Sequence, residues 1–191
     1  MNNSIKTART EYPVIDLIKN RWSPRSFAEK PIKEEIISSL LEAARWAPSA
    51  FNEQPWRFFI GIKNNNATYI KVFESLVEFN RNWAKSAPVL IVCCGKKNFA
   101  HNDNPNPTAA YDAGQSVAYL TMQALSENIY VHQMTGFDKN TLRNNLNLSD
   151  DYEINSVIAL GYLDTPDKLP EELKKIETTE RLRKDIKDLI L

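Results

Sequence analysis

Two short segments near the start of the chain carry residue types that could bind a nucleotide-like ligand. In the first, Arg21, Ser23 and Arg25 alternate along a stretch that Pro24 stiffens. Guanidinium groups bind phosphate through paired N–H donors, and a serine hydroxyl or a free backbone N–H adds another donor. A solvated pair of surface arginines is the alternative for this segment.

The second segment is a polar loop that ends at a tryptophan. It contains Ser49, Asn52 and Gln54 before Trp56, and its amides and hydroxyl can both donate and accept hydrogen bonds. The edge of a pteridine-like ring needs both kinds of partner, although a plain helix-terminating turn has the same composition. Together, the two segments indicate a bound nucleotide cofactor, and their details favour a flavin.

Several other kinds of site lack their usual motifs. None of the five glycines forms a GxGxxG or GxxxxGK[ST] pattern, which argues against a Rossmann or P-loop site. His101 and His132 have no serine or carboxylate partner at a recognisable spacing, no GxSxG elbow is present, and no metal-ligand cluster is visible. We therefore expect His132 to be part of the packed scaffold.

Composition is that of an ordinary globular protein. The 191 residues are 42% hydrophobic and 25% charged, and 24 basic side chains balance 24 acidic ones, so no nucleic-acid or acidic-membrane partner is implied. No apolar signal core or membrane-spanning run is visible. The only cysteines, Cys93 and Cys94, are adjacent and are expected in a buried strand. A cytoplasmic protein without membrane association fits these features.

Hydrophobic periodicity predicts the elements that must position these segments. Helices are expected over residues 12–22, 31–47, 66–80, 108–128 and 139–146, and strands over 56–62, 87–94, 129–134 and 154–163. Residues 96–107 are expected to form a surface loop. Because helices and strands do not alternate regularly, the fold class is α+β. We expect one domain over residues 1–191, with a C-terminal arm from about residue 164. The helix over 108–128 is apolar on most sides, which makes it a candidate subunit interface.

The order of these motifs resembles that of the nitroreductase family of FMN-dependent oxidoreductases. The resemblance covers nearly the whole chain, and six motifs in the family's order carry it. They are Arg21-x-Ser-x-Arg-x-Phe27, Ala43-Ala-Arg-Trp-Ala-Pro-Ser49 with Asn52-x-Gln-Pro-Trp56, Asn80-x-x-Trp83 leading to residues 87–91, Met134-Thr-Gly-Phe137, Ile158-Ala-Leu-Gly-Tyr162, and Arg181-x-Arg183.

The resemblance implies a central, mostly antiparallel sheet flanked by helices, in an intertwined homodimer with FMN at the subunit interface. It places Arg21, Ser23, Arg181 and Arg183 at the phosphate and ribityl chain, and Arg25 near the pyrimidine edge of the ring. It also implies ring contacts from Pro48, Ser49, Ala50 and Asn52 of the other subunit, and from Gln54 and Asn80. The backbone of Met134, Thr135 and Gly136 falls near flavin N5. The family often has an acidic residue where this chain has Thr135, so a side-chain role there is not carried over.

The activity that the resemblance implies is ping-pong hydride transfer from NADH or NADPH through FMN to small electron-poor acceptors, such as nitroaromatics or quinones. The flavin would do the chemistry, and no protein side chain is assigned as a catalytic residue. The alternatives are a specialised flavin reductase or dehalogenase on the same scaffold, and a non-enzymatic FMN-binding redox protein. The sequence leaves open the acceptor, the preferred nicotinamide, one- or two-electron nitro chemistry, and whether residues 186–191 cross to the partner.

Overall fold

A four-stranded antiparallel sheet forms the centre of the molecule. The computed structural model describes residues 4–191 and orders the strands β1-β2-β4-β3. The strands are β1 (Trp56–Ile62), β2 (Val89–Lys96), β3 (Tyr130–Met134) and β4 (Tyr152–Gly161), and each neighbouring pair is antiparallel. All four predicted strands are present, and the α+β class with an antiparallel sheet is confirmed.

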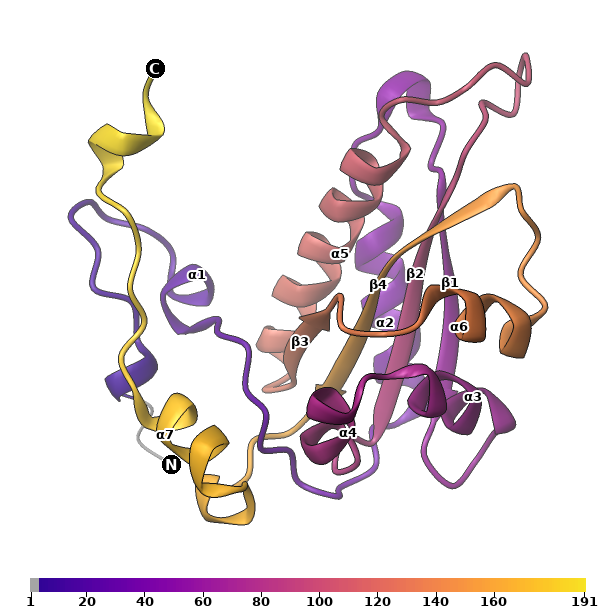
Figure 1. Ribbon diagram of the computed structural model, residues 1–191. Coiled ribbons are helices and arrows are strands. Elements are labelled where there is room, and N and C mark those ends of the chain that lie inside the picture. The colour runs from indigo at the N-terminus through magenta and orange to yellow at the C-terminus, as the bar shows by residue number, and fades with distance from the viewer. Residues whose placement is uncertain (1–3) are drawn as a thin grey trace.

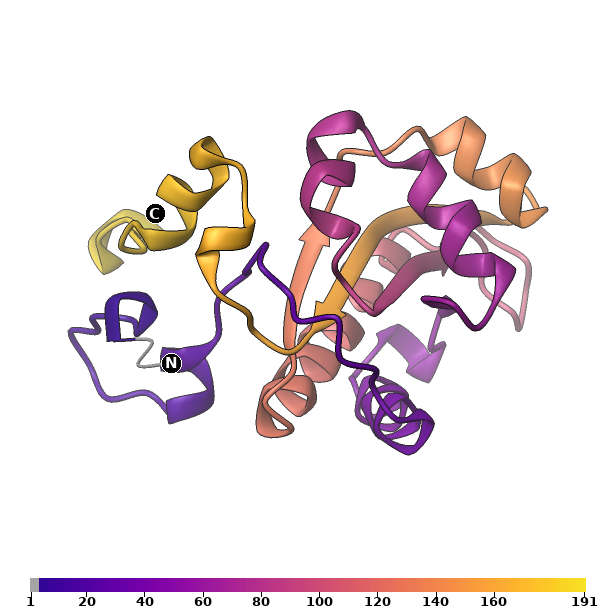
Figure 2. The same ribbon diagram turned by 90° about the horizontal axis from the view of Figure 1, so that it is seen from below.

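Helices cover both faces of this sheet. The helices α2 (Glu34–Arg45) and α5 (Ala109–Ser126) pack together on one face, while α3 (Ala67–Ser75), α4 (Glu78–Ala84) and α6 (Lys139–Leu146) lie on the other (Figures 1 and 2). Two short helices, α1 (Asp16–Asn20) and α7 (Glu171–Thr178), lie to one side. Single 3₁₀ turns complete the set: η1 (Ser4–Lys6), η2 (Ala50–Asn52), η3 (Pro166–Lys168) and η4 (Ile186–Leu189).

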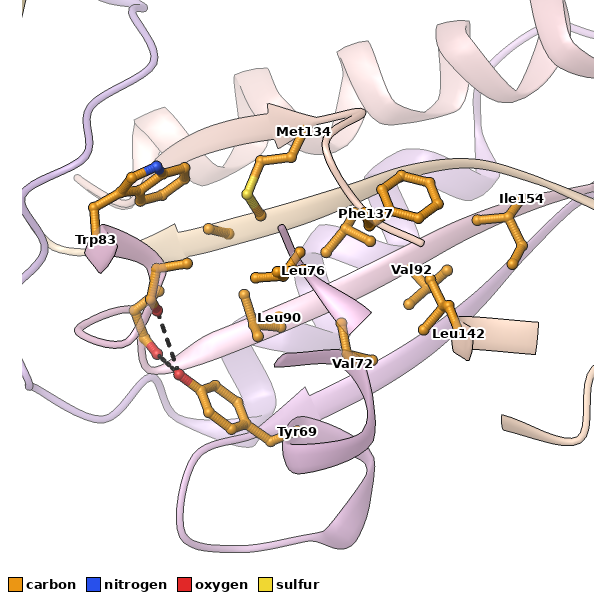
Figure 3. Packing of buried hydrophobic residues seen from close by; sticks show 14 of the residues in the cluster. Tyr69, Val72, Leu76, Trp83, Leu90, Val92, Met134, Phe137, Leu142 and Ile154 are labelled. Carbon is orange, nitrogen blue, oxygen red and sulfur yellow. Dashed lines mark hydrogen bonds between the residues drawn. The ribbon is translucent and has the colours of Figure 1, made fainter. Parts of the chain in front are cut away.

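The two central strands are buried because apolar side chains cover both of their faces. Every residue of β2 except Lys96 is buried, which explains its continuous apolar sequence. Side chains alternate between two hydrophobic clusters, with Cys93 facing α2 and α5 and Cys94 in the opposite cluster. Figure 3 shows that opposite cluster, in which the Tyr69 hydroxyl donates to the carbonyl oxygens of Ala84 and Ala87 at 3.4 and 2.9 Å.

The prediction of one helix over residues 66–80 is wrong, because the structure divides this segment into α3 and α4. Leu76, between them, is extended and buried, and it pairs with Phe137 in an isolated bridge. The Val77 N–H donates to the Gly136 carbonyl oxygen at 3.1 Å. These contacts with a distant segment interrupt the helix, and they bring Asn80 next to Gly136.

The prediction of a helix over residues 12–22 is also largely wrong. Only α1, with five residues, is helical, and Ile15 before it has the extended angles φ −62° and ψ 151°. Ile15 and Ile18 are exposed, so the apolar face read from their spacing is not buried within this chain. The helical spacing of these side chains therefore reflects a surface patch and not a core-facing helix.

The segment from residue 4 to α1 and the segment that follows β4 lie side by side in an arm next to the sheet (Figures 1 and 2). The Lys6 ammonium donates to the Ile176 carbonyl oxygen at 3.1 Å, and Arg9 pairs with Glu180 at 2.7 Å. The arm includes α7, an element that the sequence analysis did not predict. It brings Arg181 and Arg183 to the segment that contains Arg21.

Candidate functional site

The Arg21–Arg25 bend is held against the sheet by β3. Its central carbonyl, that of Pro24, lies 2.8 Å from the Nδ1 atom of His132, whose ring centroid is 4.5 Å from that of Trp83. Burial lowers the pKa of His132 to about 4, with a smaller contribution from Arg25. At neutral pH the ring is therefore uncharged, and its Nδ1–H donates to the Pro24 carbonyl. His132 is part of the scaffold, as expected.

Three arginines from opposite ends of the chain meet beside this bend. The Arg21 Nη1 donates to the Ser23 hydroxyl at 3.3 Å, and the Arg181 guanidinium donates to the carbonyl oxygens of Lys19, at 2.6 Å, and of Arg21. Burial lowers the pKa of Arg21 and of Arg181, and the nearby positive charge of Arg183 lowers both further. These guanidinium groups are therefore close enough to repel one another.

A cavity of about 690 Å³ opens at this arginine cluster. Its walls combine the three guanidinium groups with apolar and polar side chains of the arm, among them the carboxylate of Glu11. The lining residues are Ala8, Arg9, Thr10, Glu11, Tyr12, Val14, Ile18, Arg21, Arg181, Arg183, Lys184, Ile186 and Leu189. Within residues 4–191, no ion pair joins Arg21, Arg181 or Arg183 to a carboxylate, and the buried Arg181 Nε has no hydrogen-bond partner. A doubly charged phosphate fits this cluster, because it would supply the missing negative charge.

A second group of predicted residues lies where β3 ends. The Asn80 Nδ2 donates to the Gly136 carbonyl oxygen at 2.9 Å, and a Cβ atom at Gly136 would lie 2.6 Å from that same Nδ2. Met134 is buried and Thr135 is exposed. The structure thus brings Asn80 to the 134–136 turn, where a Cβ atom at position 136 would force the Asn80 amide to move.

The polar loop predicted to contact a ring has a strained backbone. Phe51, Asn52 and Gln54 all have positive φ angles, between 49° and 54°, and Phe51 is 85% exposed. Such conformations are costly for Phe51 and Gln54, because side chains other than asparagine rarely adopt them, and they persist only where the surroundings enforce them. Here the Gln54 N–H donates to the Ser49 hydroxyl at 3.0 Å.

Two further contacts hold this loop in place. The buried Asp112 carboxylate, on α5, accepts from the Ala50 N–H at 3.1 Å. The Glu53 carboxylate accepts from the Ala100 N–H at 2.7 Å, which ties the loop to the neighbouring surface loop over residues 97–107. The loop geometry is therefore fixed by Asp112, from outside the loop, and by Glu53, a side chain of the loop itself.

The predicted residues form three separate groups within one chain. The Arg21–Arg25 bend meets Arg181 and Arg183, and Asn80 meets the 134–136 turn, but the loop from Pro48 to Gln54 lies at the far end of α2, away from the arm (Figure 1). One chain alone does not gather all of them around a single ligand.

Sequence reasoning missed three buried charged residues near these groups, namely Asp112, Lys6 and Glu177. Glu177 is 4% exposed and accepts from two backbone N–H groups of the bend. No motif marks these residues, since each is one of 24 basic or 24 acidic side chains. Residues 4–191 contain no cluster of three His, Cys, Asp or Glu side chains able to hold a metal ion, and no helix among them is long and apolar enough to cross a membrane.

Comparison with known proteins gives one consistent family. The nitroreductase family profile matches residues 18–162. A solved structure described as an oxidoreductase containing FMN superposes with a TM-score of 0.85 at 34% sequence identity, covering 91% of this chain and 89% of that one.

Two curated relatives match over shorter segments. A protein of Methanothermobacter thermautotrophicus with the provisional name NADH dehydrogenase/NAD(P)H nitroreductase is 37% identical over 84 residues, which are 42% of this chain and 41% of that protein. The nitrobenzene nitroreductase of Ectopseudomonas oleovorans is 42% identical over 45 residues, which are 24% of this chain and 20% of that protein. Each match spans less than half of the relative's length.

Proposed function

Because the chain belongs to the nitroreductase family, we propose that it is an NAD(P)H-dependent oxidoreductase that uses FMN to reduce small electron-poor acceptors. The structural relative at 34% identity contains FMN, and the relatives' names include NAD(P)H nitroreductase and nitrobenzene nitroreductase. The acceptors that we propose are nitroaromatics and quinones. They would bind to the same face of the flavin ring as the nicotinamide, after the nicotinamide has left.

The arginine cluster is the observation that carries this proposal. Arg21, Arg181 and Arg183 line one cavity, none of them forms an ion pair with a carboxylate within residues 4–191, and Ser23 adds a hydroxyl beside Arg21. These groups would hold the FMN phosphate and ribityl chain. When bound, FMN would supply the hydride chemistry, since it accepts a hydride from NAD(P)H and passes one to the acceptor.

The remaining site residues would position the ring. Arg25 would lie near its pyrimidine edge, where a positive charge stabilises the negative charge of the reduced flavin. Asn80 holds the Gly136 carbonyl in place through its hydrogen bond. The backbone N–H and C=O groups of residues 134–136 would then lie in fixed positions near N5 of the flavin. Thr135 would contribute through its backbone.

We propose a homodimer to complete the site. The predicted ring-contacting loop is polar and held by hydrogen bonds, but it lies away from the arm of its own chain. Its residues are Pro48, Ser49, Ala50, Asn52 and Gln54. A second copy would bring this loop to the arm's cavity, and the exposed Ile15 and Ile18 would be covered in the same step. Each site would then combine residues from both subunits.

The test is a visible spectrum of the purified protein, followed by titration with NADH or NADPH. We expect flavin absorbance that bleaches with reductant and returns when a quinone or nitroaromatic is added, with many turnovers per protein. A colourless protein that fails to bind added FMN would refute the proposal. Stoichiometric reduction without turnover would instead indicate a non-enzymatic FMN-binding redox protein.

A further inference from the structure

The contacts of Glu177 suggest a role in building the phosphate site. This residue lies on α7, and its Oε1 accepts from the backbone N–H groups of Arg25, at 2.8 Å, and Ser26, at 3.0 Å. A carboxylate that accepts from two amides makes charge-assisted hydrogen bonds, which are stronger than neutral ones. The bend is thereby attached to a helix more than 150 positions further along the chain.

The surroundings of Glu177 connect it to both halves of the arginine cluster. Four residues beyond it, Arg181 returns to the bend and donates to the Arg21 carbonyl oxygen. From the other side, the buried Lys6 donates to the carbonyl oxygens of Ile176 and Thr179 at the end of α7. Glu177 therefore lies at the junction of three segments that must meet to assemble the arginine cluster.

The charge of Glu177 acts on Arg25 as well. The Arg25 Nε and the Glu177 Oε2 are both buried and both without a hydrogen-bond partner among the described residues. Burial disfavours the charged form of Arg25, whose pKa it lowers, and the Glu177 carboxylate opposes that effect. A buried ion held in this way depends strongly on its counterion, because the loss of one partner leaves the other uncompensated.

We propose that Glu177 is the positioning residue of the FMN phosphate site, an inference that rests on the proposed function. Its carboxylate fixes the Arg21–Ser26 bend and attaches the arm that carries Arg181 and Arg183, so that the guanidinium groups meet at one phosphate. It also partly neutralises Arg25, which reduces the positive field that this arginine would exert on the ring. Glu177 itself does not touch the ligand.

Two substitutions separate these effects. Glu177→Gln keeps an acceptor at Oε1 and removes the charge, whereas Glu177→Leu removes both and keeps similar volume. The matched control is Glu172→Gln, because Glu172 is exposed on the same helix. For each purified variant, the dissociation constants of FMN and of riboflavin would be measured by quenching of flavin fluorescence, and the two-electron midpoint potential of bound FMN by reductive titration.

We expect Glu177→Leu to weaken FMN about tenfold or more and riboflavin much less, because the phosphate contacts are charge-assisted. Glu177→Gln should weaken FMN less, and it should make the midpoint potential more positive, since Arg25 then stabilises the reduced anion without opposition. Glu172→Gln should match the wild-type protein. If Glu177→Leu does not fold, the test relies on Glu177→Gln alone, through the midpoint potential of its bound FMN and the ratio of its affinities for FMN and riboflavin.

Two results would overturn the inference while leaving the proposed function intact. One is wild-type FMN affinity and potential in the Glu177 variants. The other is an equal loss of FMN and riboflavin affinity, which would indicate general damage to the fold. A wild-type protein that binds no FMN would refute the proposed function, and this inference with it.

Discussion

Acidification should destabilise this protein through His132. Burial lowers the pKa of the folded-state imidazole to about 4, while the unfolded chain titrates near the ordinary value of about 6.5. Between these two values the unfolded state binds a proton that the folded state does not. Stability therefore rises with pH in this window and is lost as the pH falls from about 6.5 towards 4.

The size of this effect follows from the difference between the two pKa values. Each pH unit inside the window is worth about 1.4 kcal/mol, so lowering the pH from 7 to 5 should cost about 2 kcal/mol of unfolding free energy. At pH 5 most unperturbed carboxylates are still ionised, and their contribution remains small. The choice of pH 5 as the lower limit thus keeps the carboxylate contribution small.

The assay is urea unfolding at pH 7, 6 and 5, followed by tryptophan fluorescence at one protein concentration. The reference variant is His132→Asn, whose amide can donate to the Pro24 carbonyl as Nδ1 does but does not titrate. We expect the wild-type free energy of unfolding to fall by about 2 kcal/mol relative to this variant between pH 7 and 5. Parallel curves for the two proteins would show that His132 is not held neutral by burial.

Three further predictions concern other parts of the molecule. Gly136→Ala should displace Asn80 and lower the free energy of unfolding by about 1–3 kcal/mol, as measured by thermal unfolding. Gly114→Ala should instead stabilise α5 by about 0.5–1 kcal/mol, because no atom lies within 4 Å of the new Cβ. A change of stability in the same direction for both variants would contradict this reasoning. Because burial raises the pKa of both cysteine thiols to about 12, neither should react with a disulfide reagent at pH 8 until the protein is denatured, and then two thiols per chain should react. Arg183→Ala should raise the FMN dissociation constant about tenfold and Lys187→Ala should leave it unchanged, so equal values for both variants would remove Arg183 from the site.

The sequence predicted the sheet well because strand signals here are local and strong. Residues 56–62 were expected as a strand and form β1, and the continuous apolar run at 87–94 falls in β2, which is buried on both faces. The long helix over 108–128 is present as α5, but Tyr111 and Tyr119 on it are exposed, so only one of its faces is buried within the chain. Its place at a subunit interface remains a prediction.

The two wrong helix predictions failed for different reasons. Periodicity over residues 66–80 is continuous, and nothing local reveals that Leu76 pairs with Phe137. The apolar spacing near Ile15 is helical, but Ile15 itself is exposed and has an extended backbone, and only α1 after it is helical. Hydrophobic spacing cannot distinguish a core-facing helix from a surface patch that awaits a partner.

In the candidate site, too, some residues could be predicted from the sequence and others could not. Motif residues such as Arg21 and Arg181 could be found because their types and their order along the chain resemble a family pattern. Glu177 and Asp112 could not, since their role comes from burial against backbone N–H groups that only the folded chain brings to them. The sequence therefore predicts the groups that would touch a ligand better than those that hold them in place.

The contacts between the two chain ends also bear on the order of folding. The bond between Lys6 and Ile176 joins residues 170 positions apart, so it closes nearly the whole chain into a loop. Such closure costs conformational entropy before any contact compensates for it, which favours its formation late, after the sheet. We therefore expect the arm to be the last part to fold and the first to open in hydrogen exchange. A phosphate-bearing ligand would then bind only chains that have completed this final step, and its uptake would report the yield of fully folded protein.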